Sequence, residues 1–572
     1  MKSAWSIKRK IIFVLSILGL LAAALALLPG VRVFIIDIAE NFILQRKLKN
    51  SDKWHSQMII WSTLGTALFT IMCCCAAFWE HLKQNKSVNS AVLSIATINY
   101  RQFVIPVLAM FGIYTLGISA LIRADFLYID DIGRAVEGNR GWENWSRHVS
   151  VFLAMFIHAD TQINDISPLT QLIAAFLIAA SSVALVYVIN NQKITKTALA
   201  ASIPIGLSPY FLECFSYKFD SPYMALSVFA SIVPFIFIKN NLAFSSASVL
   251  GILIMCMTYQ ASSGIYIIIV ILLCFHQWST QQKTNKEIFT FMGISIVSYC
   301  IAMILFMVFL ITPNDAYSST SMYSLRQMIP GFFHNAANYF RIVRNDFGVI
   351  WEALLLLAGL SFLIKSIIAA KRHKLLVILA GIFVIMFMGI LSFGTYLVLV
   401  SPSYAPRGMI GFGIFIAMLG IYAAGSVKKA FALPALILCW CFFVFSFSYG
   451  NALAGQKRYI EFRTEMILHD LAVLFPERNA EPQPIRIIGT AGHAPVIHNI
   501  AGRNQVIKRL VPDYLNSRIF GGYFLVHHYN YHASLILESD DKIIEDEFKQ
   551  IFDSRYHTIK TDGEQVIVFL KN

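Results

Sequence analysis

The sequence predicts an all-α polytopic membrane protein with a small α/β domain at its C-terminal end. Of its 572 residues, 57% are hydrophobic and only 14% are charged, which is far less charge than a soluble protein of this size carries. Apolar runs of about 20 residues, long enough to cross a bilayer, recur through residues 1–450. Residues 451–572 differ, because they carry close to half of the 32 acidic residues. We therefore predict a transmembrane module over 1–450 and a separate domain over 451–572.

The apolar runs predict about thirteen transmembrane spans. The first run is interpreted as an uncleaved span, because it is longer than a usual signal-peptide core and lacks a small-x-small cleavage site. Two short runs are separated by a break at residues 258–264. The predicted spans are 11–29, 58–79, 103–122, 169–190, 197–213, 221–238, 244–258, 262–277, 287–311, 350–369, 374–399, 408–425 and 430–450.

The distribution of basic residues predicts the orientation in a bacterial inner membrane. Lysines and arginines gather in alternate short loops, as cytoplasmic loops do when the N-terminus is cytoplasmic. These loops account for the net charge of +14, so we expect membrane lipids and no nucleic acid as partners. The basic segment 30–57 disagrees with this pattern and is expected to lie on the bilayer surface. Loops 123–168 and 312–349 and the C-terminal domain are then predicted to be periplasmic.

The C-terminal segment has the length of a small α/β domain. Residues 456–475 and 541–552 have helical patterns, whereas 485–488 and 566–570 are typical of short strands. None of the nine cysteines lies in this segment, so it contains no disulfide. The chain has no P-loop, dinucleotide-binding glycine run or serine-hydrolase elbow. No cofactor is therefore assigned.

The first large loop contains a dense mixture of acids, arginines and tryptophans. Asp130 and Asp131 are adjacent, and repulsion between them raises the pKa of one carboxyl toward the value that suits a general base. A helical turn would place Arg134 beside either aspartate. The alternative is a surface ion pair with Trp142 and Trp145 as anchors at the lipid interface. The density of charge favours a site, and a divalent metal bound by the aspartate pair is left open.

Two further clusters lie near the ends of predicted spans. Glu213, Lys218 and Asp220 occur in an apolar neighbourhood, where charged groups are costly unless they are paired or functional. Substrate binding and a structural Glu–Lys–Asp network are equally favoured here. Tyr259 and Gln260 lie at the broken helix pair, and interrupted helices at membrane depth usually line a cavity. The alternative for this pair is a packed kink.

Several arginines are expected on the periplasmic side, where a lipid-linked phosphate needs a cation. Arginine offers a phosphate two parallel hydrogen bonds. Arg407 lies in a short loop between two spans and is the best placed, and Arg326 is the second candidate. The alternative for Arg407 is an anchor whose charged end extends to the membrane surface.

Together these clusters resemble the GT-C glycosyltransferases, and more narrowly the serotype-converting glucosyltransferases of phage-derived O-antigen modification operons. The resemblance covers residues 60–450 and depends on the order of short motifs. The motifs are Asp130-Asp131 followed by Arg134, Trp142 and Trp145; Asp165-x-Ser167-Pro168-x-x-Gln171; Glu213-x-x-Ser216-Tyr217-x-x-Asp220; and Tyr259-Gln260. The chain has Ser146-Arg147 where relatives have Gly-Arg, which weakens any role for Arg147.

The resemblance implies an enzyme that transfers a hexose, usually glucose, from undecaprenyl-phosphate-sugar to lipid-linked O-antigen in the periplasm. Asp130 or Asp131 would be the general base on the acceptor hydroxyl. Basic residues would stabilise the departing lipid phosphate, for which Arg407 and Arg326 are the candidates. The C-terminal domain is expected to set acceptor choice. The implied substrate-binding residues are Arg134, Trp142, Trp145, Glu213, Tyr217, Lys218, Asp220, Tyr259 and Gln260.

Two other functions fit a polytopic chain of this kind. An O-antigen polymerase or ligase would be expected to concentrate its arginines in a late loop, whereas here the acids of the first loop dominate. A flippase for lipid-linked oligosaccharides would place charged residues at the membrane midplane. Because the ionisable residues lie mainly at span ends, the sequence favours transfer chemistry at the membrane surface.

Overall fold

The computed structural model describes most of the chain beyond residue 100. The predicted spans 11–29 and 58–79 and the segment 30–57 lie outside the described residues, apart from a few isolated positions. The described part is 101–572 except 312–321, 426–428, 477–482, 503, 514, 518–528, 530, 532 and 537–547.

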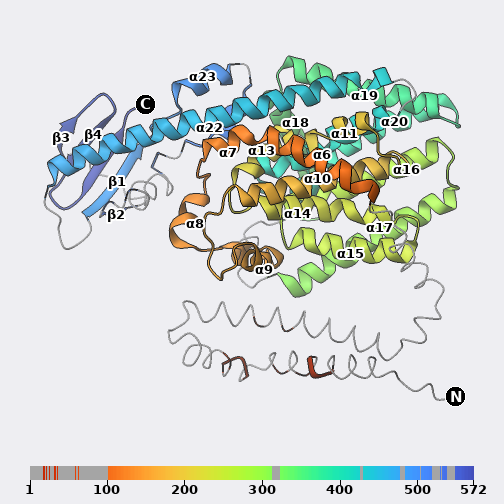
Figure 1. Cartoon of the computed structure of the whole chain (residues 1–572), viewed down its shortest axis with the longest axis horizontal. Helices are drawn as coiled ribbons and strands as arrows, with labels where there is room; N and C mark the ends of the chain where they lie inside the picture. Colours follow the sequence, from red (N-terminus) through yellow and green to blue (C-terminus); the bar gives the residue numbers. More distant parts are fainter. Residues whose placement is uncertain are drawn as a thin grey trace.

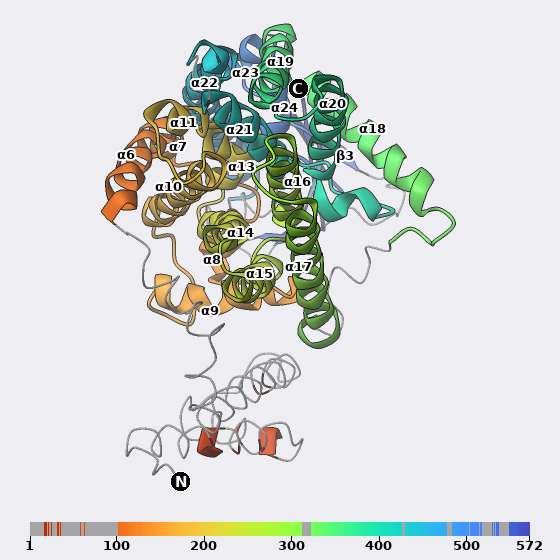
Figure 2. The same cartoon turned by 90° about the vertical axis from the view of Figure 1, so that its right-hand side faces the viewer.

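Most of the described residues form a bundle of apolar helices (Figures 1 and 2). Helix α21 lies inside the bundle: 94% of its apolar window is buried, as expected for a helix that is apolar on every side. The spans of the outer helices α17, α19 and α20 have a higher hydropathy than that of α21 but are largely exposed, so their outer faces suit lipid. The long helices of the bundle are α6 (Arg101–Gly117), α10 (Leu169–Ile189), α14 (Ser221–Ile232), α15 (Asn241–Cys256), α16 (Ser263–Ser279), α17 (Asn285–Leu305), α19 (Val349–Ala369), α20 (Lys374–Leu391), α21 (Ile410–Ala424) and α22 (Leu433–Leu474).

The described residues contain seven helices long and apolar enough to cross a membrane, or eight if one bent pair counts as a single span. The all-helical membrane architecture is confirmed at this level, but the predicted number of thirteen spans is not. Several predicted spans form shorter helices, among them Arg101–Gly117, Ser221–Phe237 and Asn241–Cys256. Their apolar runs include bends and 3₁₀ turns that hydropathy alone does not reveal.

The span predicted at 197–213 is broken into α11 (Lys196–Ala201), α12 (Pro204–Leu207) and α13 (Pro209–Ser216). Pro204 and Pro209 each occupy the first position of a helix, where the missing N–H costs nothing. A proline also prevents the preceding helix from continuing, and the chain bends by 57° before α13. The bend gives α13, which carries Glu213, its own direction.

The predicted loops contain helices of their own. Helix α7 (Ser119–Ala124) leads into the first loop, which contains α8 (Asp131–Glu137), a 3₁₀ turn (Trp142–Trp145) and α9 (His148–Ile157). The second loop contains α18 (Met328–Asp346). Both α9 and α18 expose large apolar side chains, including Phe156 and Phe333, and in α18 these lie beside exposed polar residues such as His334. Helices of this kind suit the surface of a bilayer.

Helix α22 crosses the boundary that we predicted between bundle and tail. It runs for 42 residues without interruption, which corresponds to about 63 Å. The first part packs in the bundle against α7 and α19, and the second part extends to the C-terminal sheet (Figure 1). The predicted span 430–450 and the predicted helix 456–475 are therefore one element.

The C-terminal domain contains a five-stranded sheet in the order β2-β1-β5-β4-β3. Strand β1 pairs in parallel with β2 and β5, whereas β4 pairs antiparallel with β5 and β3. The predicted strands 485–488 and 566–570 are confirmed. The helix predicted at 541–552 is wrong where it is described, because residues 549–552 belong to β3, and 541–547 lie outside the described residues. The strands are β1 (Gln483–Gly489), β2 (Ala533–Leu535), β3 (Lys549–Asp553), β4 (His557–Thr561) and β5 (Val566–Leu570).

A buried arginine attaches α22 to this domain. Arg463 is 1% exposed, and its guanidinium donates hydrogen bonds to the carbonyl oxygens of Ala491, Tyr556 and Lys571. Carbonyl groups at strand ends and turns have no sheet partner, so one fork-shaped donor can satisfy several of them. The tail and the helix that leaves the bundle thus form one packed unit.

Candidate active site

Asp131 is the buried centre of the first loop. Its side chain is fully buried, and Oδ2 accepts hydrogen bonds from the backbone N–H groups of Tyr128 (3.1 Å) and Lys218 (2.9 Å). Burial raises the pKa of this carboxyl to about 7, although the two N–H donors and Arg134 act in the opposite direction. Asp131 therefore joins the first loop to the α13–α14 connection.

Asp130 differs from its neighbour in exposure. It precedes α8 and its side chain is exposed, whereas Asp131 begins the helix and points inward. The two carboxylates thus have different surroundings in spite of their adjacency. Of the two carboxylates, only that of Asp130 is accessible to solvent.

Arg134 and Asp220 form an ion pair between α8 and the start of α14. The indole Nε1 of Trp142 donates a 2.6 Å hydrogen bond to the same carboxylate, and the Arg134 guanidinium lies over the Trp142 ring at 4.8 Å. Burial lowers the pKa of Arg134, but Asp130 and Asp131 oppose this effect, so the guanidinium is surrounded by negative charge. We expected Arg134 beside the aspartate pair; it lies near both, but its direct partner is Asp220.

Glu213 and Arg407 form the second ion pair of the site. Glu213 is 2% exposed, and its Oε1 accepts a 2.9 Å hydrogen bond from Nη1 of Arg407. The backbone N–H of Arg407 donates to the same carboxylate, so the loop before α21 is held at two points. The guanidinium also lies over the ring of Tyr217 at 5.1 Å. Arg407 thus extends into the cluster rather than outward as a membrane anchor.

Lys218 does not join Glu213 and Asp220 in a network, contrary to one of the alternatives we considered. Its Nζ contacts Asp125 and, at 2.7 Å, Asp165. Burial opposes the charged ammonium, but these two carboxylates outweigh it and raise the pKa of Lys218. The three charged side chains therefore have three separate sets of partners.

The broken helix pair brings Tyr259 and Gln260 to the same region. The hydroxyl of Tyr259 donates to the Arg407 carbonyl at 3.3 Å, and the guanidinium of Arg147 lies over its ring at 5.0 Å. Gln260 donates a 2.6 Å hydrogen bond to the carbonyl of Cys256, the last residue of α15. Tyr259 thus borders the cluster, whereas the amide of Gln260 satisfies a carbonyl at the end of a helix.

The structure leaves two predicted residues, Trp145 and Arg326, apart from the others. Trp145 is 40% exposed beside Arg147, at 5.9 Å from the guanidinium, and so belongs to the rim. Arg326 is exposed in the segment before α18 and forms no ion pair with any described residue. Most of the other predicted residues converge on what we call the acid–arginine cluster, defined by Asp130, Arg134, Glu213, Asp220 and Arg407. Lys218 and Gln260 have partners outside this cluster.

Metal binding receives no support from the described residues, because no group of three or more His, Cys, Asp and Glu side chains gathers among them. The Oδ1 atom of Asp131 is buried without a hydrogen-bond partner, but Oδ2 is engaged by two N–H groups. Asp131 therefore accepts hydrogen bonds from the backbone, whereas Asp130 faces solvent. The two carboxylates do not converge as the ligands of one metal ion would.

Sequence reasoning missed residues that support the cluster from outside its motifs. Tyr128 lies 3.3 Å from Glu213 through its hydroxyl, and its ring packs against Tyr217 at 4.8 Å. Arg509 of the C-terminal domain pairs with Asp346 of α18. Tyr128 stands just before the aspartate pair and could have been noticed. No sequence signal connects Arg509 with Asp346, which is 163 residues away.

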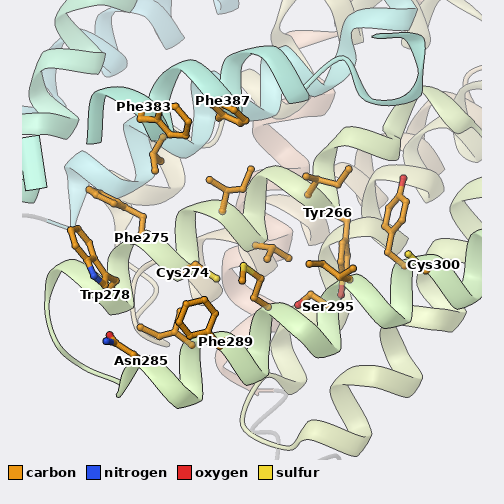
Figure 3. A pocket seen from close by; sticks show the side chains of 18 residues that line it. Tyr266, Cys274, Phe275, Trp278, Asn285, Phe289, Ser295, Cys300, Phe383 and Phe387 are labelled. Carbon is orange, nitrogen blue, oxygen red and sulfur yellow. The ribbon is translucent and has the colours of Figure 1, made fainter. Parts of the chain in front are cut away.

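Two apolar grooves lie on the bundle. One, of about 660 Å³, runs between α16, α17 and α20 and is lined by aromatic side chains such as Phe275, Phe289 and Phe383 (Figure 3). The other, of about 590 Å³, runs between α18, α19, α20 and α21 and includes Phe347 and Phe412. The rings of these two phenylalanines lie 6.1 and 6.2 Å from that of Tyr210 on α13. The second groove is therefore next to the helix that carries Glu213.

Comparison with known families decides the assignment of the chain. The family model for glucosyl transferase GtrII matches residues 119–418, which contain every residue of the acid–arginine cluster. The chain belongs to the GtrII glucosyl transferase family. It is also 25% identical over 448 residues to an uncharacterized 55.3 kDa protein in the gtrB 5′ region of Salmonella phage P22, covering 73% of this chain and 88% of the phage protein. No solved structure matches the chain significantly.

Membership of the GtrII family confirms the resemblance seen in the sequence. It supports a glycosyltransferase, specifically a glucosyltransferase, and makes the flippase and polymerase readings less favourable. The matched range ends at residue 418, before α22, and leaves out the C-terminal domain. The family assignment therefore concerns the bundle and its first loops.

Proposed function

We propose that this GtrII-family chain transfers a hexose, in the first instance glucose, from undecaprenyl-phosphate-glucose to lipid-linked O-antigen at the periplasmic face of the inner membrane. The observation that carries the proposal is the acid–arginine cluster, in an apolar helical bundle. In this cluster an exposed carboxylate, Asp130, accompanies two ion pairs whose carboxylates, Glu213 and Asp220, are buried. A reaction that moves a sugar from a lipid phosphate to an acceptor needs this combination of charge and lipid-facing surface.

Arg407 is the residue proposed to bind the donor phosphate. Its side chain is 30% exposed, so part of the guanidinium remains accessible while Glu213 holds the rest. A guanidinium fixed in this way can bind phosphate oxygens and stabilise the charge that develops as the phosphate departs. The groove beside α13 would take the first isoprene units of the carrier, because it is apolar and opens near the same helix.

Asp130 is proposed as the general base. In the transfer, the bond between the sugar C1 and the phosphate oxygen breaks as a bond forms between C1 and the acceptor oxygen. The acceptor proton passes to the Asp130 carboxylate, and the electron pair of the broken bond leaves with undecaprenyl phosphate. Arg134, Trp142, Tyr217 and Asp220 are then proposed to bind the sugar, with Asp131 bracing the loop.

The test is transfer of labelled glucose from undecaprenyl-phosphate-glucose to lipid-linked O-antigen in membranes that contain equal amounts of each variant. We expect Asp130→Asn to lose transfer by about 100-fold or more, the usual contribution of a general base. In Asp131→Asn the amide oxygen can still accept both backbone N–H groups, so this variant should keep more activity than Asp130→Asn. If the Asp130→Asn variant transfers glucose as fast as wild type, Asp130 is not the general base, and Glu213 becomes the next candidate.

Absence of transfer by the wild-type chain would overturn the donor assignment. The same preparation should then be supplied with other polyprenyl-phosphate hexoses before transfer itself is abandoned. A wild-type chain that moves lipid-linked oligosaccharide across vesicles without altering it would favour the flippase.

A further inference from the structure

A short helix of the C-terminal domain reaches the supports of the acid–arginine cluster. This helix, α24 (Val506–Leu510), contacts α13, the helix that carries Glu213. Val506, Ile507 and Leu510 are fully buried, whereas Lys508 is exposed. The end of α24 is therefore packed into the molecule.

Arg509 connects two parts of the bundle on one side of this contact. Its guanidinium pairs with Asp346 at the end of α18 and donates to the carbonyl of Tyr404. Asp346 is 1% exposed and also accepts a 3.2 Å hydrogen bond from the hydroxyl of Tyr210. Tyr210 precedes Glu213 by one turn of α13, and Tyr404 lies in the loop that leads to Arg407. One side chain thus holds the segments that carry both members of the Glu213–Arg407 pair.

The carbonyl of Leu510 makes the second connection. It accepts hydrogen bonds from the hydroxyl groups of Tyr128 (2.8 Å) and Tyr449 (3.2 Å). Tyr128 in turn lies 3.3 Å from Glu213, and Tyr449 lies 2.6 Å from the hydroxyl of Ser216 on α13. Buried hydroxyl groups need partners, and here the backbone of the C-terminal domain supplies them.

We infer that α24 of the C-terminal domain is a positioning element of the transferase site, and that Arg509 sets the placement of Arg407 relative to Glu213. The effect expected on the transfer rate rests on the proposed function. The positioning of Arg407 and Glu213 by α24 does not depend on which donor is used. Arg509 touches neither member of the pair, so it is a positioning residue and not a catalytic one. The C-terminal domain then completes the active site in addition to any part it plays in acceptor choice.

The kinetic test uses the full-length protein in lipid nanodiscs with undecaprenyl-phosphate-glucose as the donor. We expect Arg509→Gln to lower kcat/KM for the donor by about 10- to 100-fold, the scale of a displacement of about 1 Å at a reacting centre. Arg509→Lys should recover part of the loss, because an ammonium still pairs with Asp346 but lacks the fork that also reaches Tyr404. Lys508→Gln is the matched control: it makes the same change of charge one residue earlier, and we expect an unchanged rate.

A double-mutant cycle separates positioning from a general loss of structure. Arg407→Lys keeps a cation at the site and leaves a rate that can be measured. If Arg509 acts through Arg407, adding Arg509→Gln to Arg407→Lys should cost less than about 3-fold, since the placement it controls is already lost. If the rate loss of the double variant equals the product of the losses of the two single variants, the inference is overturned.

Hydrogen exchange supplies a readout that is independent of the reaction. In Arg509→Gln, the backbone amides of residues 401–409 and 209–217 should exchange faster than in wild type, whereas Lys508→Gln should match wild type. Unchanged exchange in Arg509→Gln would overturn the inference. If the wild-type chain transfers no glucose, the proposed function fails, and the exchange result still decides whether α24 positions these segments.

Discussion

At the scale of single residues, the site depends on how burial separates chemically identical groups. Asp130 and Asp131 are adjacent in sequence, but one is exposed and the other is enclosed by backbone N–H donors. Glu213 and Asp220 are both buried, and each has an arginine from a distant element as its partner. Burial of an unpaired carboxylate would be costly, so these arginines stabilise the fold in addition to the chemical role proposed for them.

Asp131 should give the protein a pH-dependent stability. Its pKa of about 7 in the folded state is above the ordinary value of 3.8, so the folded chain retains a proton that the unfolded chain releases. Stability should therefore fall as pH rises between these values, by up to about 1.4 kcal/mol per pH unit from this group, and the dependence should end above about pH 7. Thermal unfolding at about pH 5 and about pH 8 measures it.

The control for this experiment is the neighbouring residue. Asp131→Asn removes the titrating group and should reduce the loss of stability between the two pH values. Asp130→Asn makes the same chemical change at an exposed position and should keep most of the wild-type pH dependence, because burial is the largest cause of the raised pKa of Asp131. Equal pH dependence in wild type and Asp131→Asn would contradict the prediction.

The Glu213–Arg407 pair should matter through orientation. Glu213→Gln removes the charge that fixes the Arg407 guanidinium, and we expect the rate of glucose transfer to fall about 100-fold. The exposed pair of Lys283 and Glu287 offers a control, because such surface pairs contribute little. Transfer rates should be compared at equal protein abundance. A similar loss in Glu213→Gln and Glu287→Gln would indicate a general effect of the substitution rather than a role in the site.

The sequence predicted which residues lie in the same region more successfully than it predicted which of them form ion pairs with one another. Residues near Asp130, Glu213, Tyr259 and Arg407 were expected at one site, and the structure places them together. Pairing depends on the direction in which each helix presents its side chains, and this direction is fixed by tertiary packing. Lys218 was thus grouped with Glu213, although its partners are acids in the first loop.

At the scale of elements, close approach of helices sets the position of the site. Helix α22 crosses α7 at Gly450, where an added Cβ would overlap the backbone of Ala120 and Leu121. Backbone atoms cannot change rotamer to make room for the added Cβ, so the two helices would have to separate. Because α7 leads directly into the first loop, this crossing supports the segment that carries the aspartate pair.

Gly450→Ala should therefore destabilise the protein by about 1–3 kcal/mol, the usual cost of overpacking. Gly359 in α19 is the control, because an added Cβ meets no atom within 4 Å there. Alanine favours a helix more than glycine does, so Gly359→Ala should leave stability unchanged or slightly higher. Thermal unfolding in the same detergent compares the two. Equal stability of both variants would show that α22 and α7 can separate without cost.

The elements themselves were predicted where one physical signal dominates. Long apolar runs identified helices such as α10 and α19, and two short segments in the tail identified strands β1 and β5. Prediction failed where two signals compete: the change from apolar to polar residues near 450 suggested a boundary, although nothing in α22 breaks the helix. At 549–552 the apolar spacing suggested a helix, whereas pairing with β4 makes the segment a strand.

At the scale of the whole molecule, the C-terminal domain and the bundle are joined at the site itself. Lys457 of α22 binds Asp125 in the first loop, and Arg509 binds Asp346 in the second. The sequence suggested a separate domain that chooses the acceptor. In the structure the same domain also supports the cluster, so its two proposed roles are physically linked.

Exchange of residues 454–572 between two GtrII-family members should therefore have two separable effects. A chimera with the foreign tail alone should lose transfer to both acceptors, because its equivalent of α24 meets an unmatched Asp346 and Tyr404. A second chimera that also takes residues 323–348 and 400–407 from the tail's donor restores this interface and should regain transfer. If the tail sets acceptor choice, the regained activity will follow the tail's parent, as measured by labelled glucose in each O-antigen. Full activity of the first chimera with unchanged acceptor preference would show that the tail neither positions the site nor selects the acceptor.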